Sequence, residues 1–285
     1  MPAAFLVTLD GQIHDAARPF FYVDDLTVLR GDGVFETALV RGGRVLKFDR
    51  HLARLADSAR RLGLPEVQAR QWEAAAAVAT AAWGADEEGV LRLVLTRGRE
   101  SVAVEEREPT ALLYLSPVPE ATLRRREAGV GAITLERGIA ADIGARAPWL
   151  LLGAKTLSYA MNMAALRHAA ERGAQDVIFL DTTGRVLEGP TSTVVVTSGR
   201  TLRTPPPDDG ILDGTTMRAL YRHAAERGYD CRIEPLAGGD LRASDGVWLV
   251  SSVALATRVH TLDGEPLRRP EGALDLRPLV DAALA

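Results

Sequence analysis

The stretch Val34–Phe48, VFETALVRGGRVLKF, is the clearest structural signal in the chain. Its first half is apolar, Arg41-Gly42-Gly43 supplies a turn, and Arg44–Phe48 is expected to return as a strand, so the stretch predicts a β-hairpin. Residues 51–62 then place three leucines and an alanine on one helical face, and Gly63 predicts where this helix ends. A hairpin followed by a helix favours an α+β fold.

The regions around this hairpin continue the mixture of strands and helices. The expected elements are a strand at 4–9, a helix at 67–83, strands at 89–96 and 111–116, and a charged, exposed loop at 98–109. Pro117-Val118-Pro119 then breaks the pattern. We therefore expect an N-terminal α+β domain at 1–117 and a larger C-terminal domain at 118–285.

The second half alternates in the same way. Strands are expected at 131–136, 177–180, 185–187, 193–197 and 246–251, the last being the final clear strand, and helices at 156–172 and 215–227. Asp181–Gly184 predicts the turn of a hairpin.

The composition excludes several classes of function. The chain has 285 residues, a net charge of −4 and one cysteine, Cys231, which excludes a disulfide framework or a zinc site built from cysteines. The acidic balance gives no basic surface for nucleic acid, and no apolar run approaches the roughly 20 residues that span a bilayer. With no signal-peptide pattern at the start, we expect a cytoplasmic protein without nucleic-acid or membrane partners.

The common catalytic motifs are missing as well. None of the five histidines lies in an HxH or HExxH context, and GxSxG, GxGxxG and GxxxxGK[ST] do not occur. Metal sites, serine-hydrolase chemistry and nucleotide binding therefore have little support, and no metal ligands are expected.

Lys155 lies in unusual surroundings for a basic residue. Most basic positions are arginine, yet this lysine stands between the largely apolar run 149–154 and Thr156-Leu157-Ser158-Tyr159. Partial burial disfavours an ammonium group and favours the neutral amine that a Schiff base requires. A lysine that extends its ammonium to solvent is the alternative, and Lys155 alone favours it.

Two further features suit a phosphorylated pyridine cofactor. Glu188 follows the strand at 185–187, and enzymes that use pyridoxal phosphate as an electron sink place a carboxylate opposite the pyridine nitrogen. Gly210–Thr216 leads into a helix, whose N-terminal amides attract anions, and Ser252 and Arg54 could add a hydroxyl and a positive charge. The alternatives are a surface glutamate and a helix N-cap without a ligand.

At these residues the sequence resembles the class IV aminotransferase family, the fold-type IV pyridoxal phosphate enzymes, over nearly the whole chain. The matching motifs are Arg30-Gly31-Asp32-Gly33-Val34-Phe35-Glu36-Thr37, His51-Leu52-Ala53-Arg54-Leu55 with Ser58, Lys155-Thr156-Leu157-Ser158-Tyr159, Leu187-Glu188-Gly189 and Ile211-Leu212-Asp213-Gly214-Thr215-Thr216. The resemblance implies a two-domain α+β fold with a C-terminal pseudo-barrel domain, pyridoxal 5′-phosphate between the domains, and a homodimer.

The resemblance also implies roles for single residues. Lys155 would carry the Schiff base, and Glu188 would face the pyridine nitrogen. The expected phosphate contacts are Arg54, Thr215 and Thr216. Apart from the resemblance, Ser252 is expected as a further cofactor contact because it follows the strand at 246–251. The expected substrate contacts are Arg92, which resembles a substrate-carboxylate arginine of the branched-chain enzymes, and, as our own expectation, Arg97 and Tyr159.

Within the family, the sequence most resembles actinobacterial 4-amino-4-deoxychorismate lyases, which implies formation of 4-aminobenzoate and pyruvate on the way to folate. A branched-chain or D-amino acid aminotransferase is the alternative, because the cofactor machinery is shared. Arg99-Glu100-Ser101 lacks the Arg-x-His pair of the D-amino acid enzymes, and Thr193 stands where the family usually has asparagine. A non-catalytic binding relative is less expected, because Lys155 and Glu188 are both present.

Overall fold

The structure is a computed structural model that describes residues 3–285. The chain packs into two compact units. The first contains the described residues up to Pro119 together with Ala154–Tyr159, and the second contains Glu120–Gly153 and Ala160–Ala285. The domain boundary predicted between residues 117 and 118 stays a prediction. Ala154–Tyr159, which that prediction gave to the second domain, packs with the first unit.

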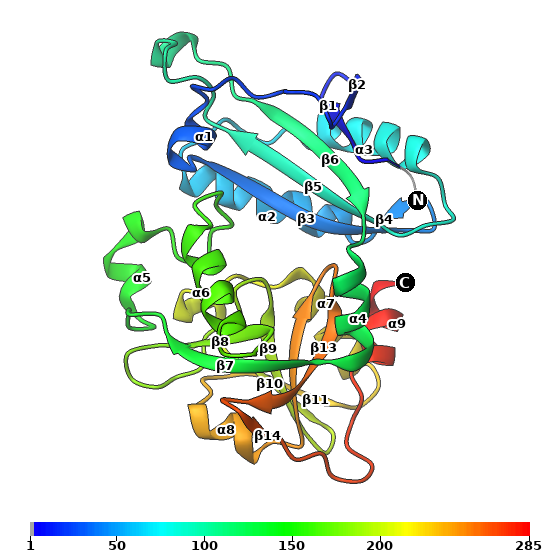
Figure 1. The fold of residues 1–285 in the computed structure, drawn as a ribbon, viewed down its shortest axis with the longest axis vertical. Helices are drawn as coiled ribbons and strands as arrows, with labels where there is room; N and C mark the ends of the chain where they lie inside the picture. The colour runs from blue at the N-terminus through cyan, green and yellow to red at the C-terminus, as the bar shows by residue number, and fades with distance from the viewer. Residues whose placement is uncertain (1–2) are drawn as a thin grey trace. The chain divides into compact units, whose positions relative to one another are not determined.

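The first unit is built on a six-stranded antiparallel sheet of order β2-β1-β6-β5-β3-β4. Its strands are β1 (Phe5–Thr8), β2 (Ile13–Asp15), β3 (Gly33–Arg41), β4 (Arg44–Val45), β5 (Gly89–Thr96) and β6 (Ala111–Pro117). Its helices are α1 (Leu26–Arg30), α2 (Phe48–Arg61), α3 (Ala69–Trp83) and a 3-10 helix at Val104–Glu106. Figure 1 shows α2 and α3 on the same face of this sheet.

Both helices and alternate strand residues share one apolar core, which includes Leu55, Trp72 and Leu93. The predicted hairpin and the helix after it are confirmed. The return strand is shorter than predicted, because β4 ends at Val45 and α2 begins at Phe48.

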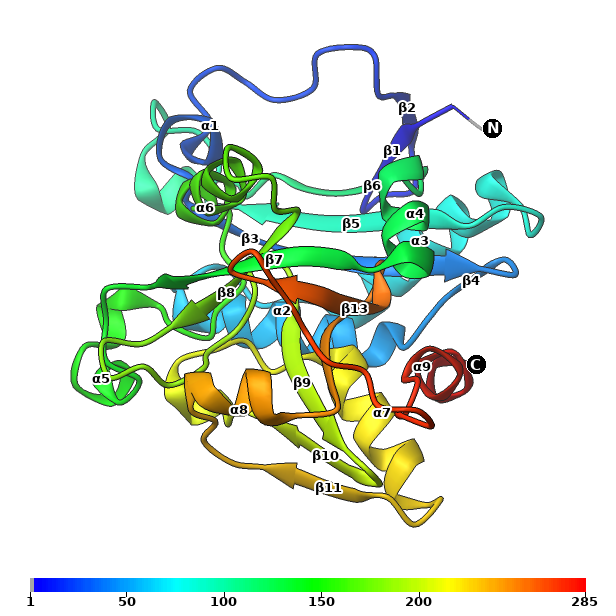
Figure 2. The same cartoon turned by 60° about the horizontal axis from the view of Figure 1, so that its bottom comes forward.

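The second unit contains an eight-stranded mixed sheet of order β11-β10-β9-β12-β13-β7-β8, with β14 paired to β13. Its strands are β7 (Val130–Glu136), β8 (Asp176–Leu180), β9 (Thr193–Ser198), β10 (Thr201–Thr204), β11 (Asp230–Ile233), β12 (Gly246–Ser251), β13 (Leu255–Leu262) and β14 (Glu265–Pro266). Its helices are α4 (Glu120–Ala128), α5 (Ile143–Arg146), α6 (Ala160–Ala170), α7 (Thr215–Ala225), α8 (Gly238–Ala243) and α9 (Arg277–Leu284), with 3-10 turns at Pro148–Leu150 and Pro207–Asp209. Figure 2 shows the sheet curling from β7 and β13 round to β10 and β11.

Apolar clusters lie on both faces of this sheet, and strands such as β8, β9 and β12, which are buried on both faces, contain continuous apolar runs. This composition explains why β8, β9 and β12 are visible in the sequence. None of the helices within residues 3–285 has both the length and the apolar character needed to cross a membrane.

Two sequence predictions for the second half are wrong, and two helices were missed. The helix predicted from Thr156 begins only at Ala160, because Thr156 pairs with Val34 of β3. The strand at 246–251 is not the last, because β13 follows it and pairs along its length. The helices α4 and α9 were not predicted at all; α4 is a short, mostly charged and small-residue segment without a clear apolar stripe.

Candidate active site

In the first unit, residues 155–157 lie extended along the edge of β3. The Phe35 N–H donates to the Lys155 carbonyl (3.1 Å), and the Leu157 N–H donates to the Gly33 carbonyl (2.8 Å). These bonds give the lysine a backbone position fixed by the sheet. The sequence motif that contains Gly33 and the motif that contains Lys155 are therefore neighbours in space.

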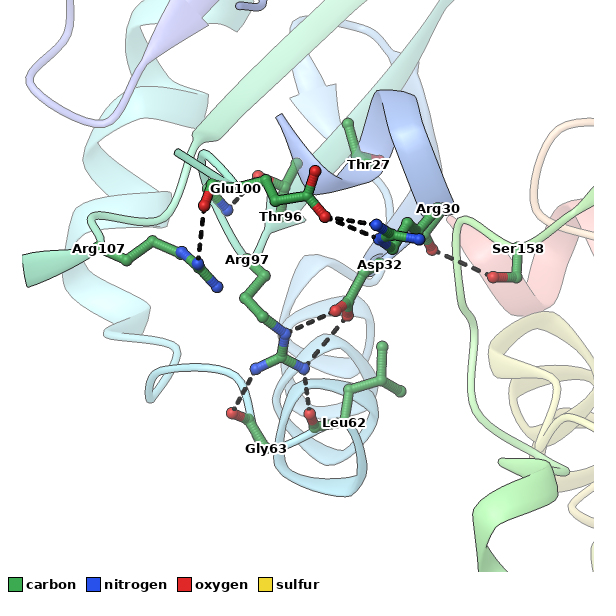
Figure 3. Close-up of polar contacts among 12 residues, drawn as sticks. Thr27, Arg30, Asp32, Leu62, Gly63, Thr96, Arg97, Glu100, Arg107 and Ser158 are labelled. Atoms are coloured by element: carbon green, nitrogen blue, oxygen red, sulfur yellow. Dashed lines mark hydrogen bonds and ion pairs between the residues drawn. The ribbon is translucent and has the colours of Figure 1, made fainter. Parts of the chain in front are cut away.

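Gly31 makes this close approach possible. Its φ of +67° lies in the left-handed region, and a Cβ there would come within 3.1 Å of the Ser158 Cα. The Ser158 hydroxyl also donates to the Gly31 carbonyl, a contact drawn in Figure 3. A side chain at residue 31 would push the lysine segment away from β3.

The Lys155 side chain is half-buried against two aromatic rings. Its Nζ lies 4.1 Å from the ring centroid of Phe35 and 5.5 Å from that of Tyr159. The two rings meet edge to face, with centroids 5.3 Å apart. The Lys155 N–H also donates to the Ser58 hydroxyl of α2 (3.1 Å). The structure thus holds the Lys155 amine in a partly buried position beside two aromatic rings.

Arg54 of α2 is paired with a buried carboxylate. Its Nε and Nη2 donate to the two oxygens of Glu36, and the His51 ring bonds the same carboxylate. Burial alone would raise the pKa of Glu36, but the charge and hydrogen bonds of Arg54, with the bond from His51, outweigh it and hold this pKa below its ordinary value. Arg54 is one helical turn before Ser58, so both face the lysine segment's side of α2.

Arg97 ties three segments of the first unit together (Figure 3). Its Nε and Nη2 donate to the two oxygens of Asp32 (2.6 and 3.2 Å), and its Nη2 and Nη1 donate to the carbonyls of Leu62 (2.6 Å) and Gly63 (3.2 Å) at the end of α2. The guanidinium therefore binds the negative end of a helix and a carboxylate. The predicted substrate contact of Arg97 stays a prediction.

Arg92 lies in β5 on the sheet face opposite the helices, because its neighbours Leu91 and Leu93 belong to the core below α2 and α3. Its guanidinium lies 5.8 Å from the ring centroid of Tyr114. Its predicted contact with a substrate carboxylate also stays a prediction.

In the second unit, Glu188 is held in a defined position beside β8. The strand predicted at 185–187 is not a regular strand but a segment with isolated bridges, and it bonds back to β8 through the Leu187 N–H and the Glu188 carbonyl. The Glu188 Oε2 accepts the Leu212 N–H (3.0 Å), and its Oε1 accepts a bond from Arg137 Nη1 (3.3 Å). The same Arg137 nitrogen donates to the Gly210 carbonyl (3.2 Å). The carboxylate thus fixes the turn that leads into α7, and it is a defined acceptor for a protonated nitrogen.

Three hydroxyl groups meet at the N-terminus of α7. The Ser252 Oγ lies 3.3 Å from the hydroxyls of both Thr215 and Thr216, and no side chain caps this helix. The N-cap is Gly214, where a Cβ would clash with the Thr193 hydroxyl. Thr193, the residue that departs from the family pattern, therefore packs directly against the start of α7.

These groups fit pyridoxal phosphate by their chemistry. The hydroxyls and first-turn amides of α7 suit a phosphate, and the fixed carboxylate of Glu188 suits a pyridinium nitrogen. Within the described part of the chain, no group of three or more His, Cys, Asp or Glu side chains is arranged to hold a metal ion.

The structure brings the predicted site residues together in two sets. Arg54, Lys155 and Tyr159 gather in the first unit, and Glu188, Thr215, Thr216 and Ser252 gather in the second. Sequence reasoning missed the partners that fix these side chains, which are Glu36, His51, Phe35 and Arg137. The first three stand inside the quoted motifs and could have been considered, whereas Arg137 has no signal beyond following a strand.

Comparisons with known proteins agree with this assignment. The family model described as "Amino-transferase class IV" matches residues 33–262. A relative from Mycobacterium tuberculosis, described as a "Bifunctional aminodeoxychorismate lyase / D-amino acid transaminase", is 51% identical over 288 residues, which cover 98% of each protein.

Two solved structures of a hypothetical aminotransferase from Mycobacterium tuberculosis share 52% sequence identity and a TM-score of 0.94 with this chain. The PLP-bound form covers 99% of both chains, and the form bound to alpha-ketoglutarate and PMP covers 98% of both. The chain therefore belongs to the class IV aminotransferase family, the fold-type IV enzymes that use pyridoxal phosphate.

Proposed function

We propose that the enzyme converts 4-amino-4-deoxychorismate to 4-aminobenzoate and pyruvate, a step towards folate. The observation that carries this proposal is the 51% identical relative, whose name includes aminodeoxychorismate lyase and whose similarity covers nearly the whole chain. D-amino acid transamination is the second candidate, because the same name includes it and the related solved structure binds alpha-ketoglutarate.

When bound, pyridoxal phosphate supplies a ring that accepts electron density from the carbon bearing the substrate's amino group. In our proposal Lys155 holds the aldehyde carbon of the cofactor between turnovers, and Glu188 keeps a proton at the pyridine nitrogen. Arg54, Thr215, Thr216 and Ser252 bind the phosphate. The bonds from Arg137 and Leu212 to Glu188 support this role, because they hold both carboxylate oxygens in a defined position.

In the lyase reaction Lys155, displaced by the substrate amine, takes the proton from the ring carbon that bears the nitrogen. The bond between the ring and the enolpyruvyl oxygen breaks, and the ring becomes aromatic. A proton then goes to the enolpyruvate carbon, which gives pyruvate, so no oxidant or second substrate is consumed. Arg92, Arg97 and Tyr159 are the proposed contacts for the substrate.

A transaminase would use the same lysine but return the proton to the cofactor carbon, and it would need a keto acid to complete the cycle. Release of 4-aminobenzoate without any keto acid is therefore the expected result for the lyase, measured by fluorescence or chromatography. Amino transfer from D-alanine or a branched-chain L-amino acid to 2-ketoglutarate, with no 4-aminobenzoate formed, would replace the lyase proposal. No turnover in either assay would leave a binding protein.

The lysine assignment has a sharp test, because the chain contains only two lysines, Lys47 and Lys155. After borohydride reduction of the holoenzyme, peptide mass spectrometry is expected to find the cofactor on Lys155. Lys155→Ala should lose the absorption band of the lysine-bound cofactor and lower kcat by about 10²–10⁴-fold or more. Lys47→Arg is the matched control and should keep both; a cofactor found on Lys47 would refute the assignment.

We also propose that the enzyme is a homodimer, as the family resemblance implies. Light scattering or native mass spectrometry should give twice the mass of one chain, and a monomer with full activity would contradict the proposal.

A further inference from the structure

A cluster of three side chains in the first unit joins Arg54 to two residues, Glu36 and His51, that the reaction scheme above does not use. Glu36 of β3 and His51 of α2 are almost fully buried, with 0% and 2% of their side chains exposed, and Arg54 of α2 is 13% exposed. Glu36 points to the core side of the sheet, as do Val34 and Val40 in the same strand. A charged residue at such a position needs a specific reason, because burial of an ion costs free energy.

The geometry leaves the Glu36 carboxylate fully occupied. Its Oε1 accepts from Arg54 Nε (2.6 Å), and its Oε2 accepts from Arg54 Nη2 (2.9 Å), His51 Nδ1 (2.7 Å) and the Thr37 N–H (3.2 Å). A carboxylate can only accept hydrogen bonds, so His51 carries its proton on Nδ1. Both oxygens are thereby fixed by two elements, β3 and α2.

This arrangement determines the direction of the Arg54 guanidinium. Two parallel bonds from one edge of a planar guanidinium fix its plane and the direction of its opposite edge. His51 in turn prevents the carboxylate from rotating away from the arginine. The pair therefore reduces the positive charge near Arg54 but fixes the geometry of its remaining donors.

We propose that Glu36 and His51 are positioning residues, which orient Arg54 so that it binds the phosphate of the cofactor. The proposal rests on the proposed function, in which Arg54 is a phosphate contact. The proposal predicts the opposite of what the change in charge alone would predict for phosphate binding. Removing the negative charge of Glu36 should weaken phosphate binding, although the surroundings of Arg54 become more positive.

The test compares two ligands of the apoenzyme, pyridoxal phosphate and pyridoxal, which lacks the phosphate. In Glu36→Gln the Kd for pyridoxal phosphate is expected to rise about ten- to a hundredfold, the effect of losing a hydrogen bond between charged groups, while the Kd for pyridoxal stays within about twofold. Glu88→Gln is the matched control, because Glu88 pairs with Arg41 Nε (2.6 Å) in the same unit, and it should change neither Kd.

His51 gives a second test that does not depend on the folding of Glu36→Gln. His51→Leu removes the Nδ1 donor and should weaken pyridoxal phosphate selectively, whereas His51→Asn, whose amide can replace Nδ1–H, should restore most of the affinity. Equal weakening of both ligands in His51→Leu would indicate a merely structural role and overturn the proposal.

The remaining outcomes separate this proposal from the one on which it rests. If Glu36→Gln binds pyridoxal phosphate as tightly as the wild type or more tightly, while Arg54→Met loses it selectively, the positioning role is wrong and the phosphate role of Arg54 stands. If Arg54→Met shows no difference between pyridoxal phosphate and pyridoxal, the phosphate role of Arg54 is wrong and the positioning proposal falls with it.

Discussion

Glu36 in the first unit and Asp176 in the second are both buried carboxylates paired with an arginine, yet their pKa values shift in opposite directions. Burial raises the pKa of both. For Glu36 the charge and two bonds of Arg54, with His51, outweigh burial and lower the pKa. For Asp176 burial outweighs the charge of Arg125 and the bond from the Val177 N–H, so the pKa is raised.

The difference lies in how each arginine makes contact. Arg54 offers two nitrogens to two carboxylate oxygens, whereas Arg125 reaches Asp176 through Nη2. The Nε of Arg125 is buried without a hydrogen-bond partner among the described residues, and 30% of that side chain is exposed. The two buried ion pairs are therefore expected to differ in how much they stabilise the fold, because only a fully bonded pair offsets the free-energy cost of burying its charges.

The largest effect is expected from removing the arginines. Arg54→Met removes the cationic partner of the buried Glu36 carboxylate and leaves the hydrogen bond from His51. The substitution should lower the free energy of unfolding by about 3–5 kcal/mol at neutral pH. Arg125→Met should cost clearly less, because burial raises the pKa of Asp176 even with Arg125 beside it, so this pair offsets less of the cost of burying its charges. Urea denaturation, with hydrogen exchange to assign the loss to each unit, measures both; equal losses would remove the contrast between the pairs.

A smaller effect is expected for Asp176→Asn. The amide oxygen can still accept the Val177 N–H bond (2.9 Å), and no charge has to be buried. The free energy of unfolding should therefore stay within about 1 kcal/mol of the wild type or increase. A loss above about 3 kcal/mol in the same denaturation experiment would mean that this ion pair stabilises the fold as strongly as the other.

The smallest effect is a dependence on pH. The lowered pKa of Glu36 gives stability that is complete above its ordinary value of 4.5 and is lost only as pH falls through the lowered value. Because the pKa of Asp176 is raised, its charged form lowers the stability of the fold at pH values above that pKa. This loss of stability disappears as pH falls towards the ordinary value of 3.8. As the pH falls from 7 towards 3.8, the wild type should therefore gain stability relative to Asp176→Asn, while its advantage over Glu36→Gln stays constant down to pH 4.5; the opposite trend would reverse the assigned shifts.

The sequence predicts more of the site's members than of the contacts that fix them. Lys155 and Glu188 are recognisable because each has local neighbours of an unusual kind, and the hairpin before α2 is recognisable by its turn. The pairing of Glu36 with Arg54, across 18 positions, and of Glu188 with Arg137, across 51, depends on tertiary packing that no local pattern encodes.

The same limit explains the error at residues 156–159. Their local sequence permits a helix, but bonds to β3, more than a hundred residues earlier, keep them extended. Local propensity is a weak guide where a distant strand offers unsatisfied backbone groups.

The path of the chain through the first unit has a consequence for biosynthesis. The chain leaves this unit after Pro119 and returns to it only for Ala154–Tyr159. Until residue 157 has emerged from the ribosome, the edge of β3 at Gly33–Phe35 lacks the segment that bonds to it, and an uncovered strand edge is a site of unwanted association between chains. A nascent or recombinant fragment that stops at residue 117 would therefore be prone to aggregation. The first unit becomes complete only after part of the second unit has been synthesised.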